Sequence, residues 1–152
     1  MMRIPMDSVV RRNFRDTPHF FLFEAEASAP PWVSLHTNER ITGWYVDPVA
    51  GHRIYFTDRA IYWSDGESRV PWDSVVDYHI VGTDPKRDSK GVRIATEHGW
   101  FFVPMAGSHG PENQCRDAFA LGMVLRVVVR HNDREGRQTE EGNDPKSGPP
   151  CS

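Results

Sequence analysis

The chain has 152 residues, of which 38% are hydrophobic and 26% charged, and its formal net charge is −3. This length fits one domain with a hydrophobic core. The net charge is slightly negative, which excludes a protein that is drawn to nucleic acid by an overall positive charge. The two cysteines, Cys115 and Cys151, have neither the number nor the spacing of a disulfide framework or a zinc site.

The first residues, MMRIPMDSVVRRNF, lack the apolar run of a signal peptide, and nowhere does the sequence reach the roughly 20 apolar residues that span a bilayer. We therefore expect a cytoplasmic protein. Fifteen of the 18 basic residues are arginine, which is typical of GC-rich genomes, so we expect a bacterial source.

Apolar residues at helical spacing predict a short amphipathic helix over residues 6–14, with arginines on its other faces. The apolar residues are Met6, Val9, Val10 and Phe14. The helix either packs on the domain, which we favour, or lies on an anionic membrane surface. The apolar block that follows, residues 19–23, is either a buried strand or a short packed segment.

From residue 40 onward the sequence predicts seven short strands, because runs rich in β-branched and aromatic residues alternate with turn residues. The predicted strands cover residues 40–46, 53–56, 60–63, 69–72, 74–81, 91–96 and 100–105. Asp65-Gly66 is a hairpin-type turn signal, and Pro71 favours an edge strand or a strand end.

A C-terminal helix is predicted from Pro111 to about Arg130, since apolar residues form one broad stripe along it. From residue 132 the chain is polar and rich in charge, so we expect a disordered tail. The predicted organisation is an N-terminal extension over residues 1–37, a domain over 38–131 and a tail over 132–152.

Three segments of this pattern resemble bacterial pleckstrin-homology and GRAM-type domains. They are residues 38–41 (NERI), 55–62 (YFTDRAIY) and 70–75 (VPWDSV), and the resemblance covers about residues 38–130. Asn38 stands where those domains carry a glycine. The resemblance implies a mainly β fold, in which a bent antiparallel sheet or barrel of about seven strands is capped by one C-terminal helix.

The side chains of Thr57 and Asp58 fall at a predicted hairpin corner, where an oxygen can accept a backbone N–H and fix the turn. Arg59 is interpreted as a corner residue as well. The seven histidines are scattered, and the sequence has no phosphate-binding loop, dinucleotide fingerprint or nucleophile elbow. We therefore expect no catalytic, cofactor or metal site and no enzyme activity.

Pleckstrin-homology-like domains are mostly binding modules, and those that bind phosphoinositides use a basic cluster at the first hairpin. Here that loop offers only Arg53 and His52, opposed by Asp47. A second group of basic residues, within residues 86–93, has acidic neighbours, and we favour its interpretation as a solvated loop. The candidate contacts for an anion or lipid are Arg53, Lys86, Arg87, Lys90 and Arg93.

The aromatic residues predict a protein-binding surface, because five tryptophans are more than a small core buries completely. Trp44 and Trp72 are the candidate partner contacts. In the strand over residues 40–46, Ile41 and Tyr45 share one face and Trp44 and Val46 the other, so both faces are apolar. Either a groove between a helix and a sheet edge binds a partner, or residues 20–32 cover this surface.

We therefore expect a non-catalytic module that binds a protein partner, with no cofactor and no nucleic acid. Two alternatives stay open. One is peripheral contact with an anionic membrane, through the N-terminal arginines and residues 86–93. The other is a small barrel enzyme or ligand carrier with an internal pocket. The sequence does not indicate the partner or the oligomeric state.

Overall fold

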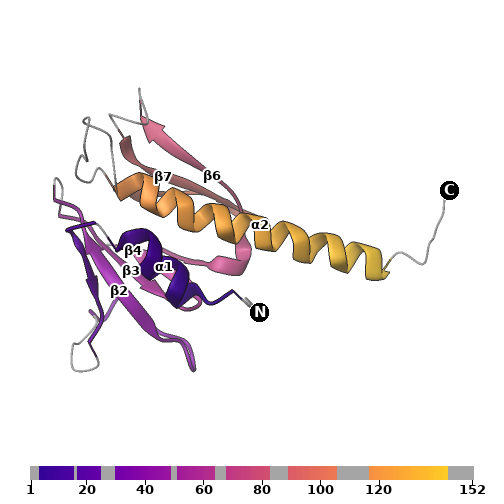
Figure 1. Ribbon diagram of the computed structural model, residues 1–152, viewed down its shortest axis with the longest axis horizontal. Coiled ribbons are helices and arrows are strands. Elements are labelled where there is room, and N and C mark those ends of the chain that lie inside the picture. Colours follow the sequence, from indigo (N-terminus) through magenta and orange to yellow (C-terminus); the bar gives the residue numbers. More distant parts are fainter. Residues whose placement is uncertain are drawn as a thin grey trace.

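The computed structural model (Figure 1) describes residues 4–15, 17–24, 30–48, 51–63, 68–82, 89–105 and 117–143, without the side chains of residues 89 and 137–143. Two α-helices, one short 3-10 helix and eight strands make up these ranges. They are α1 (Met6–Phe14), β1 (Phe20–Leu22), β2 (Ile41–Val46), β3 (Arg53–Thr57), β4 (Ala60–Trp63), β5 (Ser68–Pro71), η1 (Trp72–Ser74), β6 (Val75–Gly82), β7 (Ser89–Thr96), β8 (Gly99–Pro104) and α2 (Asp117–Asn143).

The strands form two antiparallel sheets, in the orders β1-β2-β3-β4-β5 and β6-β7-β8. Neighbours in each sheet are also neighbours in sequence, and η1 carries the chain from the first sheet to the second. The mainly β prediction with a C-terminal helix is confirmed. The apolar block near residue 20 adds an eighth strand, and the described strands leave both sheets unclosed. The predicted turn at Asp65-Gly66 lies outside the described residues.

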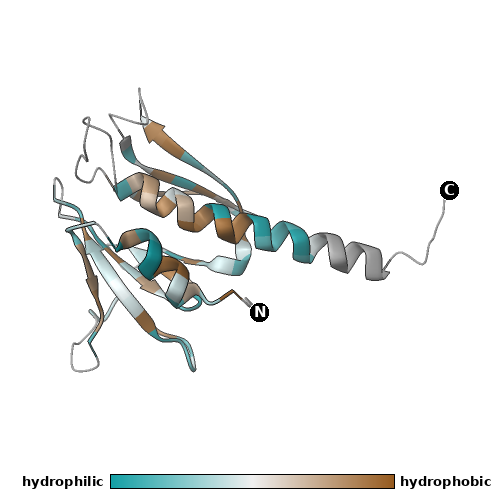
Figure 2. Ribbon diagram, viewed as in Figure 1, coloured by the Kyte–Doolittle hydropathy of each residue, from teal (hydrophilic) through white to brown (hydrophobic). Residues whose placement is uncertain are grey.

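The helix α2 lies between the two sheets, with β6 and β7 on one side and α1 on the other (Figure 1). Its apolar stripe, which includes Leu121, Leu125 and Val128, is fully buried in the core. Beyond Arg130 the helix turns polar and projects from the body (Figure 2). None of the described helices is both long and apolar enough to cross a membrane.

The C-terminal end of α2 differs from the prediction. The sequence placed it near Arg130, with a disordered tail from residue 132, but the structure continues the helix to Asn143. Glu, Arg and Gln are good helix formers, and adding residues to an existing helix is easier than starting one. His131 and Glu135 are one turn apart, and His131 Nε2 lies 3.8 Å from Glu135 Oε1. The predicted start at Pro111 is outside the described residues.

The predicted helix over residues 6–14 is confirmed as α1, and its apolar residues are used by the core. Met6, Val9, Val10 and Phe14 are all buried. The Phe14 ring packs on Phe20 and Phe56, with centroids 5.1 and 5.0 Å apart. Packing on the domain, the favoured interpretation, therefore describes this helix.

Tyr45 joins β2 to the beginning of α2. Its hydroxyl donates a hydrogen bond to the carboxylate of Asp117, and both residues are fully buried. Burial, helped by the carboxylates of Asp117 and Asp47, raises the pKa of Tyr45 far above its ordinary value. The phenol therefore remains a neutral donor, and it holds the N-terminal end of α2 against the five-stranded sheet.

A bulge in β2 changes which residues share a face. The register between β2 and β3 shifts between Ile41 and Gly43, and one extra residue moves every side chain before it to the opposite face. Ile41 therefore packs with Trp44 on the outer side of the sheet, while Tyr45 faces the main core. The prediction that Ile41 and Tyr45 share one face of the strand is therefore wrong.

Gly43 gives a test of how β1 is seated. A Cβ at this position would lie 2.5 Å from the carbonyl oxygen of Phe21 and 2.7 Å from the ring of Phe20. Because the first contact is with backbone, β1 would have to move away from β2. We expect Gly43→Ala to lower the free energy of unfolding by about 1–3 kcal/mol in urea titrations.

The matched control is Gly136→Ala in α2, where an added Cβ meets no atom within 4 Å. Alanine is favoured over glycine in a helix by about 1 kcal/mol, so this variant keeps or gains stability. A Gly43→Ala protein as stable as the wild type would contradict the close approach of β1 to β2.

Candidate functional site

The corner between β3 and β4 is held by the Thr57 side chain, as predicted. Its hydroxyl oxygen accepts the backbone N–H groups of Arg59 at 3.1 Å and Ala60 at 2.8 Å. The Asp58 carboxylate accepts the backbone N–H of Arg40 at 2.8 Å, and Asp58 N–H donates back to the Arg40 carbonyl at 3.0 Å. The corner is therefore a structural joint between β2 and the β3–β4 hairpin.

A buried carboxylate, that of Glu39, completes this joint. It accepts hydrogen bonds from the His36 backbone N–H at 2.9 Å, the Tyr62 hydroxyl at 2.9 Å, the Arg69 guanidinium at 3.2 Å and the Thr57 hydroxyl. Asn38 precedes it with a φ of +66°, in the left-handed region that asparagine and glycine tolerate best. This turn directs the Glu39 side chain inward.

The hydrogen bonds keep Glu39 charged inside the protein. Burial alone raises the pKa of this carboxyl, but the donors from His36, Thr57 and Tyr62 and the charge of Arg69 outweigh it, so the pKa lies below its ordinary value of 4.5. The stability that the charge contributes is therefore present above pH 4.5 and is lost as the pH falls through the folded-state pKa.

We expect Glu39→Gln to destabilise the protein by about 1–3 kcal/mol near neutral pH, because Arg69 loses a charged acceptor. We also expect the wild type to lose stability below pH 4.5 more steeply than this variant. Urea unfolding across the acidic range measures both effects. The control is Glu97→Gln, at an exposed turn, which should keep the wild-type dependence of stability on pH. If stability changes with pH in the same way for wild type and Glu39→Gln, the role given to the Glu39 charge is refuted.

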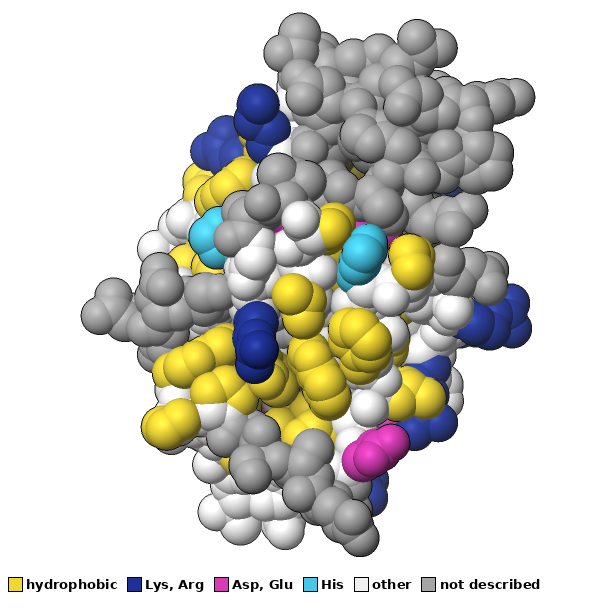
Figure 3. All heavy atoms as spheres, turned by 90° about the vertical axis from the view of Figure 1, so that its left-hand side faces the viewer, with side chains coloured by type: hydrophobic (Ala, Val, Ile, Leu, Met, Phe, Trp, Pro, Cys, Tyr) yellow, Lys and Arg dark blue, Asp and Glu magenta, His cyan; other side chains and the backbone are white. Residues whose placement is uncertain are grey.

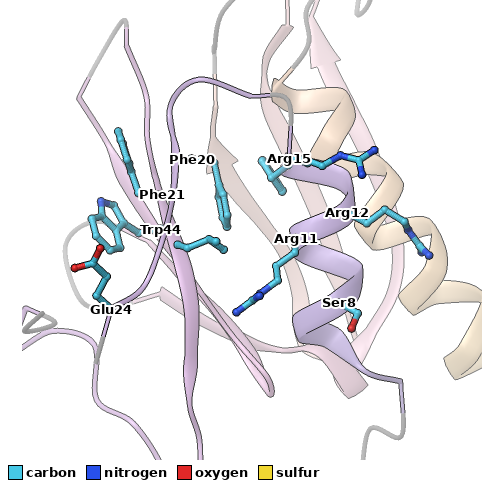
Figure 4. Close-up of a pocket in the computed structure, with 10 residues that line it drawn as sticks. Ser8, Arg11, Arg12, Arg15, Phe20, Phe21, Glu24 and Trp44 are labelled. Atoms are coloured by element: carbon cyan, nitrogen blue, oxygen red, sulfur yellow. The ribbon is translucent and has the colours of Figure 1, made fainter. Parts of the chain in front are cut away.

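A groove of about 950 Å³ lies between α1 and the edge strand β1 (Figure 4). The helix side supplies Ser8, Arg11, Arg12, Phe14 and Arg15, and the strand side supplies Phe20, Phe21, Leu22, Glu24 and Trp44. The side chain of Arg11 points from the helix toward the strand, whereas Arg12 and Arg15 extend from another side of the helix (Figure 4). One wall is therefore basic and the other apolar.

Two apolar side chains of this groove are unusually exposed. Phe21 is 45% and Leu22 50% accessible to solvent. A run such as residues 19–23 suggests burial, but β1 is the end of its sheet, and Phe21 and Leu22 are both exposed although they lie on opposite faces. The prediction of a buried strand is therefore correct in that a strand forms, and wrong in that the strand is not buried. Phe21, Leu22 and Arg11 are not among the candidate site residues that the sequence predicted.

Trp44 remains a candidate contact, since it is half-buried and lines the groove. Its ring centroid lies 5.7 Å from that of Phe21 and 6.0 Å from that of Tyr55, on the outer face of the sheet. Trp32 covers part of this face through an edge contact with Tyr55 at 5.4 Å. Figure 3 views the molecule from the side on which β1 lies and shows hydrophobic side chains gathered there beside basic ones.

Trp72 is not a surface contact. It is completely buried, and its indole N–H donates a 2.9 Å hydrogen bond to the Thr57 carbonyl. Its ring stacks on Phe56 with the centroids 6.4 Å apart. The prediction failed because the indole finds its acceptor in the backbone of the β3–β4 corner, far away in sequence, so the whole side chain can enter the core.

The three candidate basic residues that the structure describes lie in two different sheets. Arg53 lies at the beginning of β3, whereas Lys90 and Arg93 are exposed on β7 in the other sheet. Lys86 and Arg87 fall outside the described residues. The structure instead places the Arg93 guanidinium over the ring of Trp100, 4.7 Å from its centroid.

A second cleft, of about 680 Å³, lies beside the beginning of α1, and its charges are balanced. Its ionisable residues include Asp7, Asp58, Asp73, Arg40, Arg59 and Arg69. Asp58 already accepts the Arg40 backbone N–H, and Arg69 is paired with Glu39 at 3.2 Å. Such a mixture does not favour a ligand of either charge.

Within the described residues, no three His, Cys, Asp or Glu side chains lie together as metal ligands would. Comparisons with protein-family models, with curated proteins and with solved structures find no match for this chain.

Proposed function

We propose that this chain is a non-catalytic binding module, and that it binds a protein partner in the groove between α1 and β1. The observation that carries this proposal is an open groove of about 950 Å³ whose strand wall exposes Phe21 and Leu22. Adjacent exposed apolar side chains rimmed by charged ones are typical of protein-binding surfaces.

We propose further that residues 38–130 are a pleckstrin-homology-like domain of the GRAM or bacterial type. Four consecutive strands (β2–β5), three more (β6–β8) and a C-terminal helix follow in the order that this resemblance implies. The left-handed backbone of Asn38 supports it as well, because glycine, which those domains carry there, adopts that conformation readily. The groove is built mostly by the N-terminal extension, and this region contributes Trp44.

The packing of the described core favours a binding surface over an internal ligand pocket. Trp72, Phe56, Leu121 and Leu125 are completely buried and belong to one continuous core between the sheets and α2. These side chains occupy the space that a carrier would need for its ligand. The groove offers arginines and aromatic rings, which are common in protein contacts.

A displayed library of random twelve-residue peptides tests this function without knowledge of the natural partner. We expect the wild type to select peptides, and Leu22→Ser to weaken their binding by about tenfold, because an apolar contact of this size contributes on the order of 1.4 kcal/mol. Fluorescence anisotropy measures the affinities. NMR shift changes on peptide addition should centre on α1 and β1.

The control is Met123→Ser, which removes an equally exposed apolar side chain, 44% accessible, from α2. It should leave the affinities unchanged. Peptides that bind the Leu22→Ser and wild-type proteins equally well, or a library that returns no binder, would count against the groove.

A second candidate function is contact with an anionic membrane through the outer face of β7 and β8. Trp100 and Phe102 are 50% and 43% exposed, and Arg93 lies over Trp100. Phe102 is the cross-strand partner of Arg93. Tryptophan and arginine together suit the interface between water and lipid. We propose this contact as an alternative that is independent of the groove.

Co-sedimentation with phosphatidylserine-containing vesicles tests this alternative. We expect binding that salt weakens, and a loss of more than about fivefold with Arg93→Glu, since one basic residue near such a surface contributes about 1 kcal/mol and the variant also adds a negative charge. Arg134→Glu, an equal charge change on an exposed residue of α2, is the control. If the protein binds equally well to phosphatidylcholine vesicles, which carry no net charge, the proposed electrostatic contact is refuted.

A further inference from the structure

We infer that the groove recognises an extended acidic and apolar segment of its partner, which adds as a strand to the edge of β1 that faces away from β2. This inference rests on the proposed protein-binding function and specifies the chemistry of the partner. The direction of the β1 backbone groups, the faces of its side chains and the charge of α1 support it.

The hydrogen bonds of β1 show which backbone groups face this edge. The Val46 N–H donates to the His19 carbonyl at 3.0 Å, and the Phe23 N–H donates to the Thr42 carbonyl at 3.0 Å. In an antiparallel pair the bonded residues alternate along the strand. The backbone N–H and C=O groups of residues 19, 21 and 23 therefore point toward β2, and those of Leu22 point away from it.

The outward side of β1 is the end of the described sheet. Backbone groups exposed along a strand edge bind another extended chain through main-chain hydrogen bonds, while alternate side-chain positions provide specificity. The groove includes all three β1 residues and side chains from both faces of the sheet. It therefore surrounds this edge, and an added strand would lie in it.

The side chains beside the edge differ between its two faces. Phe20 packs inward on Phe14, and by alternation Leu22 faces the same side, toward α1. Phe21 lies on the outer face against Trp44, with ring centroids 5.7 Å apart. A strand added here would place one set of side chains between Leu22 and α1 and the other set beside Phe21 and Trp44.

The charge of α1 favours acidic residues in the inner set. Arg11 points toward β1 (Figure 4), and its pairing with Asp7, at 3.1 Å, is half-exposed and therefore easily exchanged. Arg12 and Arg15 also line the groove, although their side chains extend from another side of α1 (Figure 4), and no described carboxylate forms an ion pair with either. Among the described residues that line the groove, Glu24 is the one that is acidic.

These charges favour a partner over a second copy of this chain. Pairing of two β1 strands would bring a second α1, with its own three arginines, beside the first, and like charges repel. A partner strand that carries carboxylates on its inner face meets the arginines with opposite charge. On its outer face, apolar side chains would extend the contact between Phe21 and Trp44.

The test uses an eight-residue peptide in which Glu alternates with Leu or Val, labelled with fluorescein. We expect salt-sensitive binding, at least about tenfold weaker when Lys replaces Glu. Two further analogues carry N-methyl groups on alternate amides, one on the Glu positions and one on the others. Only one set of amides can face β1, so one analogue should bind as the parent does and the other should fail.

Protein variants complete the test. Arg11→Glu should weaken the parent peptide at least about tenfold, and Asp7→Asn, which frees Arg11, should strengthen it about twofold. Arg134→Glu should have no effect. Circular dichroism and unfolding midpoints confirm that the variants fold, and all affinities are measured on the full chain.

The outcomes separate this inference from the proposed function. If library-selected peptides occupy the groove but neither N-methylation nor charge reversal matters, strand addition is overturned while protein binding stands. If no displayed peptide binds, both fall. A concentration-dependent dimer that Leu22→Ser abolishes would also overturn the inference, since a second copy would then hold the edge.

Discussion

The carboxylate of Glu39 is the interaction on which the five-stranded sheet depends. It is buried, and four donors from the preceding loop, the β3–β4 corner, β4 and β5 converge on it. A buried charge is tolerated only when it is paired and hydrogen-bonded, so this arrangement admits one register of these segments. Thr57 links it to Trp72, whose indole N–H binds the Thr57 carbonyl. The same corner thereby fixes where the chain leaves the first sheet for the second.

The groove depends on a different constraint, which is the close seating of β1 on β2. Gly43 lets the backbone and Phe20 approach to distances that any side chain would prevent, and the Phe20 ring then stacks on Phe14 and packs against Phe56. The Thr17 N–H donates to the Phe14 carbonyl at 3.1 Å and closes the turn after α1. Helix and strand are thus held at a set separation, and the groove between them exists before any partner arrives. Such preorganisation reduces the entropy lost on binding.

Local pattern was enough to predict most elements, and long-range contacts decided what it could not. Helical spacing gave α1 with its bounds, and aromatic and β-branched runs gave β4 from Ala60 to Trp63. The bulge at Ile41 broke the alternation on which face assignments rest. Trp72 is buried because a distant carbonyl accepts its N–H, which no local pattern encodes. Phe21 and Leu22 are exposed because β1 is an edge, and edge or centre is a property of the assembled sheet.

An exposed edge strand also attracts unwanted pairing, and β1 has features that limit it. It is only three residues long, and charged residues flank it, with Glu24 just after the strand and Arg11 across the groove. Short, charge-flanked edges resist indiscriminate association. The same features select among partners, because a short strand supplies few main-chain hydrogen bonds and leaves much of the affinity to side chains. Specificity would then come from the arginines of α1 and the aromatic rings around Trp44, and these face each other only because the N-terminal extension packs α1 and β1 beside β2.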